Sequence, residues 1–192
     1  MLTRGILLAA GSGSRFGGGK MLAPLPDGTP IGVASWRNLV AALADSVVVI
    51  RSGDVPLRNV LQAEGATIIE CADADSGMSR SLIAGLTATK NDSGWVIALG
   101  DMPFIRPATV GKIAGAIEDG ELIAMPTFGG ERGHPVGLSA RLQSELMAIK
   151  GDEGAREIVR RHASEICLIA CDDDAGIVRD IDRREDLGGS DA

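Results

Sequence analysis

The chain has 192 residues, a length that fits one well-buried domain and is short for two. Its 19 Lys and Arg against 26 Asp and Glu give a net charge of −7, which disfavours nucleic acid as the main partner. An acidic chain can still hold one basic pocket for a phosphorylated small molecule. Because 45% of the residues are hydrophobic and 3% are aromatic, we expect a core of Ala, Val, Ile and Leu, as in parallel α/β sheets.

Strand-like and helical runs alternate along the chain. Short β-rich runs cover 5–9, 47–50, 67–70, 95–99, 122–126, 135–138, 166–171 and 177–181, and apolar residues recur at helical spacing in 31–43, 56–64, 79–87, 107–117, 139–149 and 154–161. This alternation predicts an α/β fold with a Rossmann-like, doubly wound, mostly parallel sheet and helices on both faces. We expect a single domain over residues 1–187 and a frayed tail at 188–192.

Sheets of this kind bind ligands beyond the carboxyl ends of their strands, where the strand order reverses. The loops after Ala9, Cys71 and Leu99 are therefore the first places to search for a site. Pro107 suits the first turn of a helix, and Ser139 suits an N-cap.

The sequence also indicates a cellular compartment. No apolar run approaches the roughly 20 residues that span a bilayer, and the start lacks the pattern of a secretory signal. Cys71, Cys167 and Cys171 form neither an even disulfide set nor a CxxC pair. We therefore expect reduced thiols, a cytoplasmic protein and no membrane partner.

The first predicted strand runs directly into a glycine-rich loop with two cations. Residues 8–20 hold five glycines together with Arg15 and Lys20. Glycines adopt positive φ angles and leave backbone N–H groups open, so this loop is suited to phosphate, and its cations can neutralise a triphosphate. Composition alone leaves a flexible loop with incidental charges as an equally good interpretation.

Two better-known glycine motifs do not match this loop. A dinucleotide fingerprint needs a third glycine where Phe16 stands, which argues against a nicotinamide oxidoreductase. A Walker A loop needs a glycine at the position of Ser14 and a hydroxyl at the position of Met21. Both motifs are excluded by spacing.

Carboxylates follow two of the predicted strands. Asp101 comes directly after the apolar run 95–99 and therefore lies at the carboxyl end of a central strand, where it can hold Mg²⁺. A cap for the turn before Pro103 is the alternative. Asp180 and Asp182 point to the same side if their segment is extended, and for Asp180 we favour a solvated acidic turn.

Three other segments place polar side chains near the predicted strand ends. Ser79 and Ser81 open a helix, whose N-terminus favours anions and whose hydroxyls can contact a base or a ribose, although helix capping explains Ser79 equally well. Arg132 and His134 lie between two predicted strands; His134 can titrate near neutrality, but a lone histidine is more often structural. Arg156 opens a later helix and is a candidate for binding a phosphate.

These segments resemble, in chain order, the motifs of the MobA/MocA-like nucleotidyltransferases, and particularly of their molybdenum cofactor cytidylyltransferase branch. The glycine loop resembles LAAGxSxRxG…K, and the other segments are similar to GMSxSL (77–82), GDxP (100–103), RGHPV (132–136), GDxGAR (151–156) and DIDxxxDL (180–187). The chain departs from these motifs at Phe16, where Met is frequent, and at Arg183 and Arg184, where Thr-Pro is frequent. The resemblance covers nearly the whole chain, and six motifs in one order are specific.

The resemblance implies a role for each matching residue. It makes Lys20, Arg15 and Asp101 catalytic, Asp101 and Asp182 ligands of Mg²⁺, and Arg132, His134 and Arg156 acceptor-binding. For Asp152, in the GDxGAR segment, an N-cap is a sufficient explanation. The nucleotide-binding residues that it implies are Leu8, Ala9, Ala10, Gly11, Ser12, Gly13, Ser79, Ser81 and Gly100.

The family implies transfer of a nucleoside monophosphate from a triphosphate to the phosphate of a molybdopterin-type acceptor, with release of pyrophosphate. Ala10 gives the LAAG start of the CTP-using branch, whereas LAGG is typical of the GTP-using branch, so CTP is the expected nucleotide. A molybdenum hydroxylase that receives the product is the implied protein partner. Transfer to another phosphorylated acceptor, or a non-catalytic carrier of the cofactor for a hydroxylase, are the alternatives.

Overall fold

The computed structural model describes residues 2–89, 93–151 and 154–188. Within these ranges eight strands form one sheet in the order β3-β2-β1-β4-β7-β5-β6, and β8 pairs with the other side of β5. The strands are β1 (Thr3–Leu8), β2 (Ser46–Arg51), β3 (Thr67–Cys71), β4 (Gly94–Leu99), β5 (Ile123–Phe128), β6 (Glu131–Arg132), β7 (Val136–Ser139) and β8 (Ile166–Ala170).

The central strands are parallel and buried on both sides. β1 pairs in parallel with β2 and β4, and β2 with β3, whereas β7 runs antiparallel to β4 and β5. The apolar sequences of β2 and β4 fit this position, because strands covered on both faces need no polar side. The expected α/β architecture with a mostly parallel sheet is confirmed.

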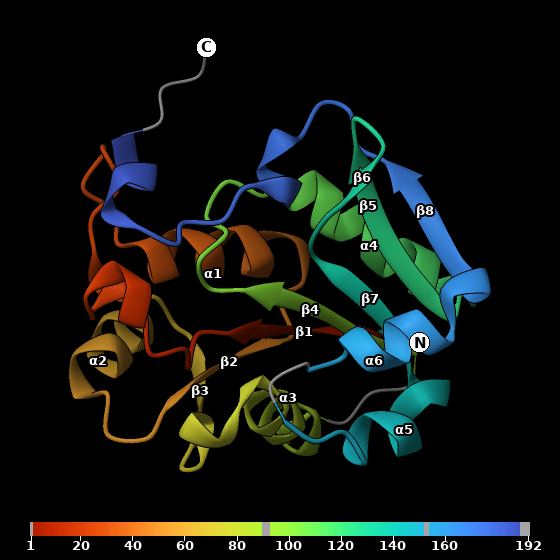
Figure 1. Cartoon of the computed structure of the whole chain (residues 1–192), viewed down its shortest axis with the longest axis horizontal. Helices are drawn as coiled ribbons and strands as arrows, with labels where there is room; N and C mark the ends of the chain where they lie inside the picture. Colours follow the sequence, from red (N-terminus) through yellow and green to blue (C-terminus); the bar gives the residue numbers. More distant parts are fainter. Residues whose placement is uncertain (1, 90–92, 152–153, 189–192) are drawn as a thin grey trace.

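Helices cover both faces of the sheet (Figure 1). Helices α1, α2 and α4 pack on one face, where Leu7, Val48 and Val96 point, and α3, α5 and α6 pack on the other, where Ile6 and Val49 point. Within the described ranges no helix combines the length and apolar character that crossing a bilayer requires. The helices are α1 (Ile31–Ala42), α2 (Val55–Ala63), α3 (Met78–Ala88), α4 (Pro107–Glu118), α5 (Gln143–Met147) and α6 (Arg156–Arg161).

Most predicted helices are present, with one divided. Pro107 occupies the first turn of α4, and the Ser139 hydroxyl accepts a hydrogen bond from the Arg141 backbone N–H at 3.3 Å, as expected for a cap. The predicted helix 139–149 is a 3₁₀ turn, η4 (Ala140–Leu142), followed by the short α5. A 3₁₀ turn is a common form of a helix end.

The predicted last strand at 177–181 is wrong. The chain instead forms the 3₁₀ turn η6 (Ala175–Val178) and continues without strand pairing. The Asp174 side chain, which is 2% exposed, fixes this turn by accepting hydrogen bonds from the Thr109 hydroxyl and from the backbone N–H groups of Arg106 and Gly176. Ile177 of this segment is buried in the core cluster that also holds Leu7 and Val96, and Ile181 is buried beside Phe16 and Ile31, so both are buried without joining the sheet.

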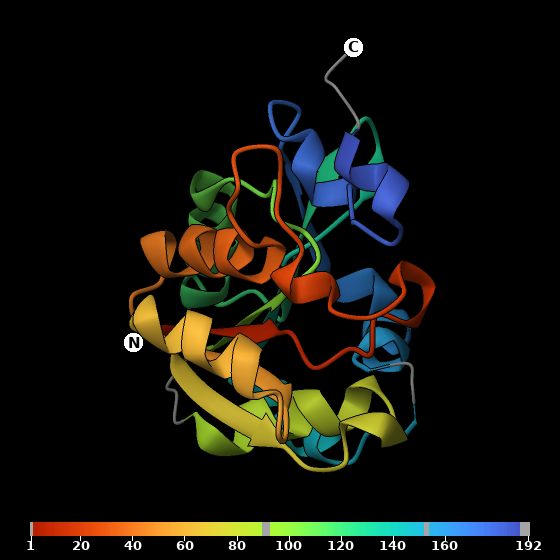
Figure 2. The same cartoon turned by 90° about the vertical axis from the view of Figure 1, so that its left-hand side faces the viewer.

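The C-terminal segment, residues 174–187, lies against the loops at the carboxyl ends of β1 and β4. The Ile181 backbone N–H donates to the Asp101 carbonyl at 2.9 Å, and the Arg184 guanidinium lies 4.9 Å from the centre of the Phe16 ring. Figure 2 shows this segment in dark blue beside the N-terminal glycine loop in red. The fold therefore brings the glycine loop and the C-terminal segment together beyond the carboxyl ends of β1 and β4, while residues 189–192 lie outside the described ranges.

The strand order also fixes where a ligand can enter. β1 lies between β2 and β4. After β1 the chain moves along the sheet toward β2 and β3, whereas after β4 it moves the opposite way, toward β5. A crevice opens at such a reversal, beyond the carboxyl ends of the two strands.

Replacing Asp174 by Ala is expected to lower the free energy of unfolding by about 2–3 kcal/mol, because three buried donors lose their acceptor. The neighbouring Asp173 is exposed, and its Ala variant is expected to change the free energy by less than about 0.5 kcal/mol. Urea unfolding of both variants measures the difference. Equal effects would contradict the anchoring role of Asp174.

Candidate nucleotide and acceptor site

A cavity of about 500 Å³ lies beyond the carboxyl ends of β1 and β4. Leu8 and Leu99 are register partners at the ends of these strands, and both reach the cavity. The lining residues are Leu8, Ala10, Gly11, Ser12, Gly13, Arg15, Lys20, Met21, Arg51, Ala74, Asp75, Gly77, Met78, Ser81, Leu99 and Asp101.

The glycine loop folds Lys20 into this cavity. Gly13 has a φ of 58°, in the left-handed region, and a Cβ on it would lie 3.0 Å from the Lys20 Cβ. A larger residue there would be strained and would press on Lys20. The loop continues through two 3₁₀ turns, η1 (Ser14–Phe16) and η2 (Lys20–Leu22), which bury Phe16 and leave Arg15 exposed.

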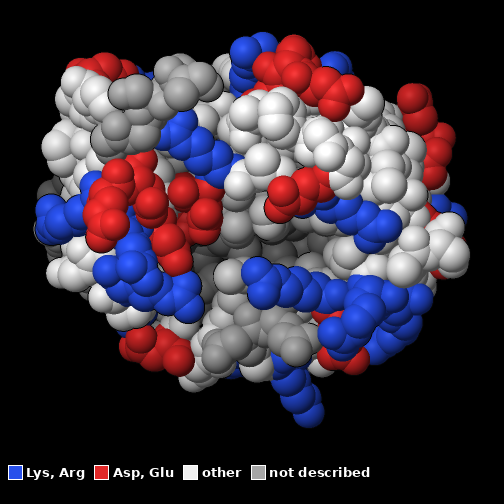
Figure 3. All heavy atoms as spheres, turned by 45° about the horizontal axis from the view of Figure 1, so that its top comes forward, with Lys and Arg blue, Asp and Glu red and all other residues white. Residues whose placement is uncertain are grey.

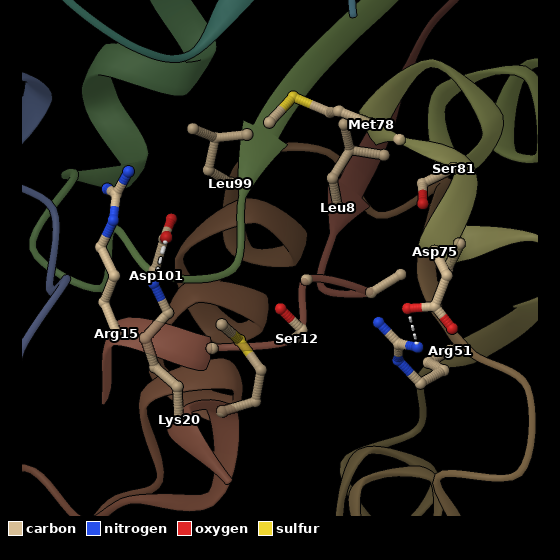
Figure 4. A pocket seen from close by; sticks show the side chains of 16 residues that line it. Leu8, Ser12, Arg15, Lys20, Arg51, Asp75, Met78, Ser81, Leu99 and Asp101 are labelled. Carbon is tan, nitrogen blue, oxygen red and sulfur yellow. Dashed lines mark hydrogen bonds and ion pairs between the residues drawn. The ribbon is translucent and has the colours of Figure 1, made fainter. Parts of the chain in front are cut away.

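Two cations of the loop pair with carboxylates from distant parts of the chain. Lys20 Nζ donates to Asp101 Oδ2 at 2.7 Å and lies 3.6 Å from Asp182 Oδ1, and Arg15 Nη1 donates to Asp182 Oδ2 at 2.7 Å. The hydrogen bond from Arg15 lowers the pKa of Asp182, and the charge of Lys20 lowers it further. Figure 4 shows Arg15, Lys20 and Asp101 together on one side of the cavity.

The same carboxylates form a group that fits a divalent cation. One oxygen each of Asp101, Asp180 and Asp182 lies within 4.8 Å of the others. Mg²⁺ prefers oxygen ligands and keeps several waters, so a half-exposed group of carboxylates suits it. Asp186 accepts hydrogen bonds from the backbone N–H groups of Asp182 and Arg183 and thereby holds this turn.

The predicted nucleotide-binding residues divide into two groups. Leu8, Ala10, Gly11, Ser12, Gly13 and Ser81 line the cavity, but Ala9, Ser79 and Gly100 do not. Ser79 is fully buried, and its hydroxyl has no hydrogen-bond partner among the described residues. Gly100 packs tightly instead: an added Cβ would lie 3.0 Å from the Ala9 Cβ. Their proposed contact with a nucleotide stays a prediction.

The sequence analysis missed an ion pair at the other end of the cavity. Arg51 ends β2, Asp75 lies in the turn η3 (Ala74–Ser76), and the two side chains are paired. Figure 4 shows this pair across the cavity from Lys20, with Ser12 and Ser81 nearby. The strand-end rule would have found Arg51, because β2 is parallel to β1 and ends at the same edge.

A second cavity, of about 370 Å³, adjoins the first. Arg132, His134 and Arg156, all predicted to bind the acceptor, line it, and so does Arg160 of α6. Asp152, from the same motif as Arg156, lies outside the described residues. The remaining walls are mostly aliphatic, from Leu8, Leu82, Ile97, Leu99, Met125, Val136, Leu138 and Val159.

The second cavity favours the uncharged form of the His134 imidazole. Burial lowers the pKa of its imidazole, the charge of Asp101 opposes this shift, and the charge of Arg156 adds to it. Its Nδ1 is buried without a hydrogen-bond partner among the described residues, and its backbone N–H donates to the Ile177 carbonyl. A neutral imidazole beside arginines can form hydrogen bonds to a ligand without adding charge.

The two cavities adjoin each other. Leu8, Met78 and Leu99 line both of them, so a ligand in one cavity meets a ligand in the other at the ends of β1 and β4. Figure 3 shows a hollow in this face with acidic and basic side chains gathered around it. The arrangement can hold a polyphosphate with a cation next to a second, partly apolar anion.

Known proteins with similar sequences span almost the whole chain. Nicotine blue oxidoreductase of Paenarthrobacter nicotinovorans is 30% identical over 179 residues, which cover 89% of this chain and 88% of that protein. The purine catabolism protein PucB of Bacillus subtilis strain 168 is 26% identical over 192 residues, covering 95% and 92%.

Solved structures share the fold. Rv0371c of Mycobacterium tuberculosis H37Rv superposes with a TM-score of 0.81 at 24% identity, covering 97% of this chain and 96% of that one. Its complex with manganese gives a TM-score of 0.75 at 24% identity over 88% of each chain. The model of the MobA-like NTP transferase domain matches residues 5–166, and the chain therefore belongs to this nucleotidyltransferase family.

Proposed function

We propose that the protein transfers CMP from CTP to the phosphate of a molybdopterin-type acceptor, with release of pyrophosphate and with Mg²⁺ as cofactor. The observation that carries the proposal is the pair of adjoining cavities, one with the cation and carboxylate group and the other with arginines and aliphatic walls. In this proposal the product is a dinucleotide made across their common wall, and a molybdenum hydroxylase in the cytoplasm receives it.

The first cavity suits a nucleoside triphosphate. Lys20 and Arg15 hold the phosphates and stabilise the pyrophosphate that leaves, because cations are most effective where charge develops. The base and the ribose extend toward Ser81, Arg51 and Asp75, which line the opposite end.

Asp101 and Asp182 would hold Mg²⁺, with Asp180 within reach of the same ion. When bound, the ion neutralises charge on the α-phosphate and orients it. The manganese complex of Rv0371c supports a divalent ion in this fold. In the structure the carboxylates are already paired with Lys20 and Arg15, so these cations exchange carboxylates for phosphate oxygens when nucleotide and ion bind.

The reaction needs no general base. An oxygen of the acceptor phosphate forms a bond to the α-phosphorus, the bond from that phosphorus to the bridging oxygen of the β-phosphate breaks, and pyrophosphate leaves. The attacking oxygen is already deprotonated, so positioning and charge neutralisation carry the rate. The neutral His134 accordingly binds the acceptor and takes no proton.

The second cavity suits an acceptor with one anionic group and an apolar body. Arg132 and Arg156 offer charge-assisted hydrogen bonds to its phosphate. The aliphatic walls cover a heterocycle, and His134 contacts its polar edge. This division of charge and apolar surface supports a molybdopterin-type acceptor over a sugar phosphate, whose hydroxyl groups need many hydrogen bonds.

A second candidate, a nicotinamide-dependent oxidoreductase, rests on the name of the 30% identical relative, an oxidoreductase. Two adjoining cavities also suit a dinucleotide. The glycine loop argues against it, because Phe16 stands where the dinucleotide fingerprint has its third glycine.

The proposed function is tested by pyrophosphate release with each of the four nucleoside triphosphates, Mg²⁺ and molybdenum cofactor, together with mass analysis of the product. We expect release with CTP and a cytosine dinucleotide as product. Equal use of all four triphosphates would exclude the CTP preference. Oxidation of a reduced nicotinamide cofactor without any pyrophosphate release would favour the oxidoreductase.

Asp101→Ala and Lys20→Ala are each expected to abolish turnover while the fold is retained. Loss of one preorganised charge at a transferred phosphate costs on the order of 10²–10³-fold in rate. Pyrophosphate release measures turnover, and circular dichroism measures the fold. Arg37→Ala, which removes an exposed ion pair with Glu64 far from the cavity, is the control and keeps the wild-type rate. Wild-type rates in either site variant would refute its role.

Arg15→Gln is expected to raise the pKa of Asp182 toward its ordinary value, because the hydrogen bond that lowers it is lost. The contribution of this pair to stability is present above the ordinary pKa of an aspartate and is lost as the pH falls through the lowered one. Carboxyl NMR titration measures the shift. Arg37→Gln, the matched control, should raise the pKa of Glu64 and leave Asp182 unchanged; an unmoved Asp182 in Arg15→Gln contradicts the pairing.

A further inference from the structure

Three apolar side chains form the wall between the two cavities. Leu8, Met78 and Leu99 are the lining residues common to both, whereas Lys20 and Asp101 line only the first and Arg132 lines only the second. Leu8 and Leu99 are fixed, because they are paired in register at the ends of β1 and β4. Met78 is the member of the wall that belongs to neither strand.

Met78 is exposed although its side chain is large and apolar. Its exposed fraction is 43%, and it is the first residue of α3, directly after Gly77, whose φ is 114°. Figure 4 shows its thioether extending over the cavity toward Leu99, above Leu8. On the other side it meets Gly154, where an added Cβ would lie 3.2 Å from the Met78 sulfur. The side chain therefore spans the entrance between the start of α3 and the turn before α6.

An exposed thioether at this place is suited to close over ligands. Met is unbranched and polarizable, so it adapts to surfaces of different shape at little strain. Covering it with bound ligands removes apolar surface from water, which is favourable. Because Met78 lines both cavities, its side chain is covered most completely when both cavities are filled.

We propose that Met78 keeps water away from the α-phosphorus and thereby favours transfer to the acceptor over hydrolysis of the nucleotide. This inference rests on the proposed nucleotidyl transfer. In the competing reaction a water oxygen forms a bond to the α-phosphorus, the bond to the bridging oxygen breaks, pyrophosphate leaves, and the proton of the water passes to solvent. The reaction needs no further reactant, so the protein must exclude water from this point by shape.

The test compares hydrolysis with transfer at saturating acceptor. Nucleoside monophosphate and dinucleotide are measured by chromatography for the wild type, Met78→Ala, Met78→Leu and Met147→Ala. We expect Met78→Ala to raise the ratio of monophosphate to dinucleotide about tenfold, the effect typical of a missing apolar group in a pocket. Met78→Leu, which keeps the apolar volume, should stay near the wild-type ratio.

Met147 is the matched control. It is 41% exposed and lies in α5, and it lines neither cavity, so its Ala variant should leave the ratio unchanged. A second measurement follows oxidation of both methionines by peroxide with mass spectrometry. CTP and acceptor together should protect Met78 at least about fivefold, as expected when a covering ligand removes its solvent exposure, while Met147 stays reactive.

The outcomes separate this inference from the proposed function. Normal transfer with an unchanged ratio in Met78→Ala, or equal changes in Met78→Ala and Met147→Ala, would overturn the role of Met78 alone. So would an unprotected Met78 in the presence of both substrates. A wild-type protein that releases no pyrophosphate from any triphosphate overturns both.

Discussion

A buried ammonium group needs an opposite charge within reach, and Lys20 finds it on Asp101, in the turn after β4. The side chain of Lys20 is 9% exposed and donates to Asp101 at the end of β4. Leaving either charge without its partner in this partly buried place would be unfavourable. This pair requires the glycine loop and the end of β4 to lie close together. Two glycines permit this: the left-handed Gly13 leaves space for Lys20, and Gly100 packs closely on Ala9.

The pair also explains how an acidic protein can bind a triphosphate. The net charge of −7 is spread over the whole chain, but at the site two carboxylates are balanced by Lys20 and Arg15. In the proposed reaction a divalent ion on these carboxylates would set both cations free for the phosphates. The second cavity has a different lining, in which arginines stand beside aliphatic walls.

The sequence predicted most of the sheet, its helices and nine of the sixteen residues that line the first cavity, because these depend on local periodicity and on strand ends. The sequence-based prediction was wrong where the orientation of a side chain or a contact between residues far apart in sequence determines the structure. Ser79 and Ser81 both open α3, but they stand two positions apart on a helix, so only Ser81 reaches the cavity. The run 177–181 has the apolar pattern of a strand, yet Asp174 draws it into a turn over Thr109, a contact between residues far apart in sequence. Asp180 was interpreted as part of a solvated turn and is indeed exposed, but folding places it within 4.8 Å of Asp101.

The carboxylates of the site come from two parts of the chain that fold under different constraints. Asp101 follows a strand in the middle of the sheet, whose two apolar faces are covered by helices. Asp182 belongs to the C-terminal segment, which is held by Asp174, by the backbone bond from Ile181 to Asp101 and by Arg15. Such polar contacts at the edge of a fold open at lower free energy than a buried sheet does. The sheet can therefore be intact while this carboxylate group is incomplete, and in the proposed reaction part of the free energy of binding ion and nucleotide would be spent on holding the segment in place.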